Sequence, residues 1–152
     1  MAFIFLSTNL QAQQATVGVT LIPAGSFKAK STDVKGFATK KGDEVSAKNI
    51  VVDLKDLKTG VDLRDKHTKK HLETDKFPQA ILVSATGKGG KGTGVIKIRG
   101  IEKNIAGTYK VEGNTLVAQF PLVLSEFGIT GIKYMGVGVD DEVRVQVSVP
   151  IK

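Results

Sequence analysis

The sequence predicts an all-β protein of about eight or nine strands, folded as a closed barrel or a sandwich. Two observations lead to this fold class. Apolar and polar residues alternate along most of the 152-residue chain, as they do in strands with one buried and one solvated face. Glycine-rich turn segments separate the alternating runs at spacings of roughly ten residues.

Nine segments carry the alternation. The clearest is the run of valines at every second position from Val143 to Val149, separated by Arg144, Gln146 and Ser148. The predicted strands cover residues 17–22, 26–31, 34–40, 45–54, 80–86, 93–99, 104–111, 115–124 and 143–150. Turns are expected at residues 41–43, 87–94 and 112–114.

One segment breaks this pattern. Residues 61–76 are rich in charged side chains and show no alternation. We therefore expect one short helix or ordered loop near residues 63–72, which ends before Pro78 and the next strand.

Composition limits the chemistry. The length suits one domain, and without cysteine the chain has no disulfide, no thiolate nucleophile and no Cys-based metal site. The net charge of +7 is densest over residues 87–110, which hold six basic residues and one acidic residue. Nucleic-acid binders interleave such charge with exposed aromatic residues, whereas this segment has only Tyr109, so we expect no nucleic-acid partner.

The amino terminus resembles the end of a secretory signal. An apolar run from Ala2 to Leu6 leads to the small residue Ala12, which predicts a signal-peptide remnant over residues 1–12 and one domain over residues 13–152. No Lys or Arg precedes the run, so an ordinary amino-terminal strand is the alternative. No other segment is long and apolar enough to predict a transmembrane segment.

Two motifs could carry a metal or a cofactor, and neither is convincing. His67 and His71 are four residues apart, with Glu73 or Asp75 as a third ligand, but flanking lysines would oppose a cation. A solvated helix with local ion pairs is the alternative, and no metal site is predicted.

The glycines of residues 87–92 match a dinucleotide fingerprint in letters only, because strand alternation rather than a helix follows them. We expect a hairpin there and no cofactor. No serine lies in a nucleophile motif. We therefore predict that the protein has no catalytic residues and is not an enzyme.

The charged segment and the carboxyl-terminal half resemble the YceI-like family. The matching residues are Thr59-Gly60, Arg64-Asp65-Lys66-His67, Leu72, Phe77-Pro78, Ser125-Glu126-Phe127-Gly128-Ile129 and Gly136-Val137-Gly138-Val139-Asp140-Asp141-Glu142-Val143. The resemblance implies a periplasmic or secreted protein with a closed, eight-stranded, antiparallel, lipocalin-like barrel. Members are described as binding polyisoprenoids or other long-chain lipids inside the barrel.

One residue and one segment depart from the family pattern. Lys30 stands where many members have a histidine, and the segment from residue 36 to 59 looks shorter than usual, which would trim two strands.

The resemblance implies non-enzymatic binding, transport or sequestration of a long-chain lipid of polyisoprenoid or fatty-acyl type. Small residues at Gly107 and Ala118, on inward faces, favour a narrow channel. The expected lipid contacts are Phe120, Leu122, Leu124, Phe127, Ile129 and Met135.

Near the helical segment, Arg64 and Asp65 are expected to form a buried pair with His67 hydrogen-bonded beside it, and these three are also head-group candidates. The alternative function is a stress-response or interaction module with a side-chain-filled barrel and no lipid. Besides the lipid, a second copy of the chain in a homodimer is the other partner considered.

Overall fold

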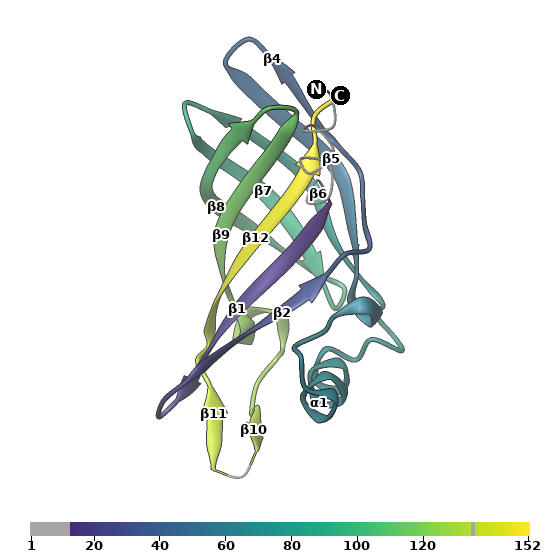
Figure 1. Cartoon of the computed structure of the whole chain (residues 1–152), viewed down its shortest axis with the longest axis vertical. Coiled ribbons are helices and arrows are strands. Elements are labelled where there is room, and N and C mark those ends of the chain that lie inside the picture. The colour runs from purple at the N-terminus through teal and green to yellow at the C-terminus, as the bar shows by residue number, and fades with distance from the viewer. Residues whose placement is uncertain (1–12, 135) are drawn as a thin grey trace, which may run out of the picture.

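Antiparallel pairing joins every strand into one 12-stranded sheet that curls into a barrel, with one α-helix outside one end (Figure 1). This computed structural model describes residues 13–134 and 136–152, so the predicted signal remnant lies outside the described residues. The strands are β1 (Gln14–Ile22), β2 (Ser26–Ser31), β3 (Val34–Lys35), β4 (Ala38–Lys41), β5 (Glu44–Asp53), β6 (Gln79–Lys88), β7 (Lys91–Ile98), β8 (Ile101–Glu112), β9 (Thr115–Val123), β10 (Lys133–Tyr134), β11 (Val137–Val139) and β12 (Glu142–Pro150).

Tight hairpins connect the long strands where the sequence predicts turns. Two residues separate β4 from β5, β6 from β7, and β8 from β9. Gly89 and Gly90, between β6 and β7, both have positive φ, of 63° and 85°, a backbone that glycine adopts without strain. The glycine-rich motif is therefore a hairpin, as predicted.

The barrel closes through the segment that follows β1. β2 pairs with β1, and after Thr32 and Asp33 the chain continues as β3, which pairs with β5. Ser31, at this change of partner, is fully buried and donates its hydroxyl to the Asp53 carbonyl oxygen at 2.9 Å. On the far side, Ala38 forms a parallel bridge with Ile151, which brings β4 against the end of β12.

The barrel is nearly closed and nine strands form its wall. This count agrees with the eight or nine strands predicted from alternation and differs slightly from the eight that the family resemblance implies. The predicted strand over residues 34–40 is divided into β3 and β4 at Gly36, whose φ is 124°. A side chain there would strike the backbone of β5, since an added Cβ would lie 3.1 Å from the Ile50 Cα. The sequence also missed the short hairpin of β10 and β11.

The charged segment forms the helix α1 (Asp62–Leu72), close to the predicted residues 63–72. No residue of α1 is buried, and Glu73 ends the helix in a left-handed conformation with φ of 52°. A short 3-10 helix, η2 (Leu54–Asp56), leads into this region from β5. None of the helices in the described part of the chain is long and apolar enough to span a membrane.

The inward faces of the strands supply the core. At the end of the barrel near α1, Ile96, Ile98, Leu122, Phe127 and Ile129 are all buried, so large side chains fill this half. Phe127, which is 1% exposed, belongs to the 3-10 helix η3 (Leu124–Phe127) that follows β9.

Arg99 connects three elements at this end. Its guanidinium pairs with the Glu73 carboxylate at the end of α1, and Nη1 donates to the Phe127 carbonyl oxygen at 2.9 Å. Gly128 leaves space for it, because a Cβ there would lie 2.7 Å from Nη1. Arg99 ends the predicted strand over residues 93–99 and follows the apolar Ile98, so alternation would place its side chain in solvent, but only 16% of it is exposed.

We expect Arg99→Ala to lower the free energy of unfolding by about 2–3 kcal/mol, because charge-assisted hydrogen bonds to two elements are lost. Arg99→Lys should recover only part of this loss, since an ammonium group lacks the planar fork that reaches both acceptors. Chemical unfolding measures the effect, with exposed Lys97→Ala as the control. Equal losses at Arg99 and Lys97 would contradict the assignment.

Candidate functional site

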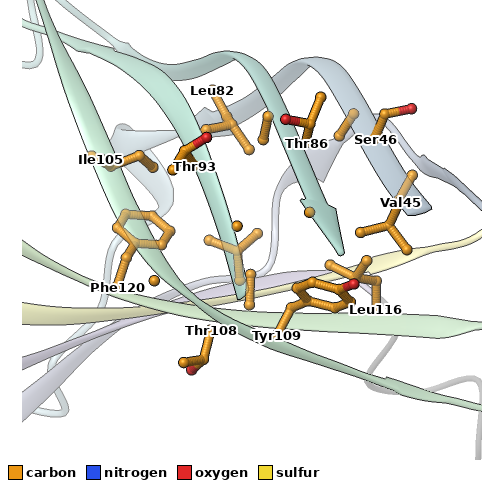
Figure 2. Close-up of a pocket in the computed structure, with 18 of the residues that line it drawn as sticks. Val45, Ser46, Leu82, Thr86, Thr93, Ile105, Thr108, Tyr109, Leu116 and Phe120 are labelled. Atoms are coloured by element: carbon orange, nitrogen blue, oxygen red, sulfur yellow. The ribbon is translucent and has the colours of Figure 1, made fainter. Parts of the chain in front are cut away.

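A cavity of about 80 Å³ lies inside the barrel (Figure 2). The strand segments that line it are at the end of the barrel away from α1 (Figure 1). The cavity walls come from the parts of β5, β6, β7, β8 and β9 near the turns at residues 42–43, 89–90 and 113–114. Val147 and Val149 of β12 and Ala38 of β4 complete the lining. The site is therefore built from inward side chains of most of the wall.

Small residues make room for this cavity. Gly87, Gly92 and Gly107 stand opposite one another in a row across β6, β7 and β8, and all three line the cavity. Ala47, Ala85 and Ala118 line it as well. Large side chains fill the α1 end of the barrel, whereas at this end the corresponding space is lined by residues with little or no side chain.

The glycine row also has a structural role. An added Cβ at Gly107 would lie 2.1 Å from the Gln119 carbonyl oxygen, and one at Gly87 would lie 2.5 Å from the Tyr109 ring. The Tyr109 ring of β8 therefore reaches past β7 to Gly87 of β6, in space that a side chain at Gly87 would take. The rings of Tyr109 and Phe120 are the two aromatic groups among the lining residues (Figure 2).

The lining is suited to an apolar group. None of the described residues that line the cavity is an aspartate, glutamate, histidine, lysine or arginine. Ser46, Thr86, Thr93, Thr108 and Gln119 also border the cavity, but all five are exposed and alternate with inward residues of their strands. The side chains of Ser46 and Gln119 hydrogen-bond to Thr39 and Gln146 at exposed positions. The arrangement therefore offers mainly apolar burial, and the described lining residues supply no carboxylate or imidazole to act as an acid or a base.

The structure separates the predicted lipid contacts. Phe120 lines the cavity, as do the small residues Gly107 and Ala118. Leu122, Phe127 and Ile129 belong to the packed core, and Leu124 lies partly buried against it. Met135 lies outside the described residues.

The residues predicted on the helical segment lie at the opposite end of the barrel, on α1 (Figure 1). Arg64 stacks over the Phe27 ring of β2 at 4.5 Å from its centroid. Asp65 accepts hydrogen bonds from the Thr59 backbone NH at 2.7 Å and from its hydroxyl at 2.6 Å. The two side chains are half-buried and have different partners, so they attach α1 to β2 and to the preceding loop separately.

The hydrogen bond from the Thr59 hydroxyl lowers the pKa of Asp65 below its ordinary value of 3.8. Burial partly opposes this shift, and the Thr59 backbone NH lowers the pKa further. His67 lies half-buried on the same helix. For His71, burial lowers the pKa, and the neighbouring His67 and Lys70 add to the effect. Within residues 13–134 and 136–152 no three His, Asp or Glu side chains are grouped as a metal site would need.

Sequence reasoning missed Gly87 and Gly92 as cavity residues because it assigned residues 87–94 to a turn. A register shift between Leu82 and Ser84 on β6 changes which side chains face inward, so Ala85 and Gly87 line the cavity. The available signal was the row of small residues at alternate positions: Ala85 and Gly87, then Gly92 and Gly94.

The fold and the cavity define a class of protein, a small antiparallel barrel with an internal apolar cavity. The YceI-like domain family matches residues 7–151, nearly the whole chain, and the chain belongs to this family. The match begins at residue 7, inside the predicted signal remnant. No curated protein sequence is significantly similar to the chain.

Solved structures share the fold at low sequence identity. BcnA of Burkholderia cenocepacia is 15% identical with a TM-score of 0.68, over 90% of this chain and 94% of that protein. A polyisoprenoid-binding domain of Saccharophagus degradans, implicated in plant cell wall breakdown, is 12% identical with a TM-score of 0.59, over 91% and 92%. A mutant CJ YCEI protein with a monobromobimane guest is 14% identical with a TM-score of 0.54, over 80% and 83%.

We expect Gly107→Ala to lower the free energy of unfolding by roughly 2–3 kcal/mol, because the added methyl group meets backbone that can move only with its strand. Gly18→Ala on β1 is the matched control, since its Cβ would meet nothing closer than 3.7 Å. Urea unfolding compares the two variants, and equal stabilities would show that the close approach of β8 and β9 does not require glycine.

We expect Asp65→Asn to cost about 1 kcal/mol of stability at pH 7, because the carboxylate accepts two hydrogen bonds from Thr59. Since the folded-state pKa is lowered, this stabilisation is present above the ordinary value of 3.8 and is lost as the pH falls through the lowered pKa. The difference from wild type should therefore shrink in acid. Urea unfolding across pH tests this, with exposed Asp75→Asn as the control; a difference independent of pH would contradict it.

Proposed function

We propose that the chain is a non-enzymatic lipid-binding protein that takes the aliphatic chain of one long-chain lipid into the barrel. The observation that carries this proposal is the internal cavity, whose described lining residues include no ionisable acid, histidine, lysine or arginine. Burial of each methylene group in such a cavity contributes about 0.8 kcal/mol. Transfer of hydrocarbon from water is therefore the main driving force for binding.

The size of the cavity limits what enters it. Its volume of about 80 Å³ is roughly half that of an engineered cavity of about 150 Å³ that binds benzene. The cavity accommodates a short part of one slender chain as it stands. A longer part requires the rings of Tyr109 and Phe120 to rotate away from the space between the strands (Figure 2).

Family membership supports a ligand of polyisoprenoid or fatty-acyl type. The Saccharophagus degradans domain with this fold is a polyisoprenoid-binding domain. Transport or sequestration of such a lipid, in the periplasm or after secretion, fits the apolar run at residues 2–6 and the family to which the chain belongs. The proposal needs neither a cofactor nor nucleic acid, and a homodimer is compatible with it.

The alternative is a stress-response or interaction module with a filled barrel, and one observation favours it. Large side chains already fill the half of the barrel near α1, including Ile98, Leu122 and Phe127. If Tyr109 and Phe120 keep their positions, the remaining volume holds no more than a short part of a lipid chain. The two functions therefore differ in whether these rings move.

Native mass spectrometry of protein purified from its own host, with analysis of an organic extract, tests the proposal directly. We expect a bound lipid in wild type. Ala118→Leu should reduce lipid occupancy at least tenfold, because its larger side chain projects into the cavity at a cost of roughly 1.4 kcal/mol or more in binding.

Ala24→Leu, in the exposed turn between β1 and β2, is the matched control and should keep wild-type occupancy. Circular dichroism checks that both variants are folded. A wild-type protein without lipid in either measurement would overturn lipid binding and favour the filled-barrel module.

A further inference from the structure

The end of the barrel that holds the cavity has an excess of positive charge. We define the cavity rim as residues 37–44, 88–91, 110–114 and 151–152, which surround this end. Its charged residues are all exposed and comprise six lysines and three acids: Lys40, Lys41, Lys88, Lys91, Lys110, Lys152, Asp43, Glu44 and Glu112. The rim therefore has a net charge of +3.

The acids leave part of this charge unbalanced. Glu112 lies 3.8 Å from Lys110, and Glu44 stands opposite both Lys41 and Lys88. Lys91, by contrast, stands opposite Lys88 and Thr108. Two like charges directly opposite each other in a hairpin cost stability in the free protein, and an anionic partner would remove that cost.

Apolar groups accompany the lysines. Phe37 is 46% exposed, with the Lys152 ammonium 5.7 Å from its ring centroid, and Val111 is 37% exposed. Val111 follows Tyr109 by two residues on β8 and therefore lies on the same inward face of that strand. The apolar inner wall thus continues from the cavity to exposed surface at the rim.

The opposite end of the barrel has no such excess of positive charge. Ile22, Val61, Leu63 and Val137 are exposed there. The segments that join the strands at that end, residues 23–25, 32–33, 54–78, 99–100 and 124–141, hold nine basic and nine acidic residues. An anionic surface would therefore be attracted more strongly to the rim than to that end.

We propose that the cavity rim docks on the surface of an anionic membrane, with its lysines on the phosphates and with Phe37 and Val111 at the level of the head groups. Lysines near an anionic bilayer are attracted to it individually, and exposed apolar residues beside them add binding through burial. The proposal rests on the proposed function in one respect: docking in this orientation presents the cavity to the lipids from which its ligand is drawn.

Sedimentation with lipid vesicles tests this orientation. We expect wild type to bind vesicles of phosphatidylcholine mixed with phosphatidylglycerol, to bind phosphatidylcholine vesicles far more weakly, and to dissociate as salt is added. Lys88→Gln with Lys91→Gln should weaken binding about 30-fold, since each lysine near the surface contributes about fivefold.

Lys66→Gln with Lys70→Gln, on exposed positions of α1, removes the same charge from the opposite end and is the matched control. This variant should bind within about twofold of wild type. An equal or larger loss in the α1 variant, or no preference for anionic vesicles, would overturn the proposal.

Docking and lipid binding can fail separately. Ala118→Leu should still sediment with anionic vesicles although its cavity is filled. Lys88→Gln with Lys91→Gln should keep the lipid found by native mass spectrometry in wild type while losing vesicle binding. Loss of vesicle binding in Ala118→Leu, with the fold intact, would count against docking through the rim charges.

Discussion

Closure of the sheet is the constraint on which the rest of the structure depends. The chain from β2 to β3 pairs first with β1 and then with β5, and the buried Ser31 hydroxyl satisfies the Asp53 carbonyl at the change of partner. An unpaired edge there would expose backbone groups and open the interior to water. Because the sheet closes, the inward faces of its long strands share one interior, and their side-chain volumes decide whether that interior is filled.

Large side chains fill one half of the barrel interior, and the other half contains the cavity. Near α1, Leu122, Phe127 and Ile129 fill the barrel, and Arg99 ties the helix end to the loop after β9. At the other end, a row of glycines brings the strands close together while leaving a small apolar cavity. One end therefore supplies stability, while the other retains space that a ligand could use, and the proposed docking surface surrounds that second end.

The architecture could largely be predicted, whereas the site could be predicted only in part. Alternation and glycine-rich turns indicated the long strands and the hairpin at Gly89-Gly90, and the charged segment without alternation indicated a helix or ordered loop near residues 63–72, because these depend on local spacing. Phe120, Gly107 and Ala118 were correctly assigned to inward faces, but alternation does not say at which height in the barrel a residue lies. The division at Gly36 and the register shift on β6 depend on contacts between strands, so the sequence did not indicate them.

The sequence by itself determined the all-β class, the positions of the turns and the family resemblance, since each follows from residues close together in the chain. Only the tertiary structure decided where the cavity lies and which charges surround it. Arg99 shows the reason most clearly: its place in a strand pattern predicts a solvated side chain, yet Glu73 and Phe127, each 26 or more residues away, enclose it. Contacts at that separation are set by closure of the barrel, which no local pattern encodes.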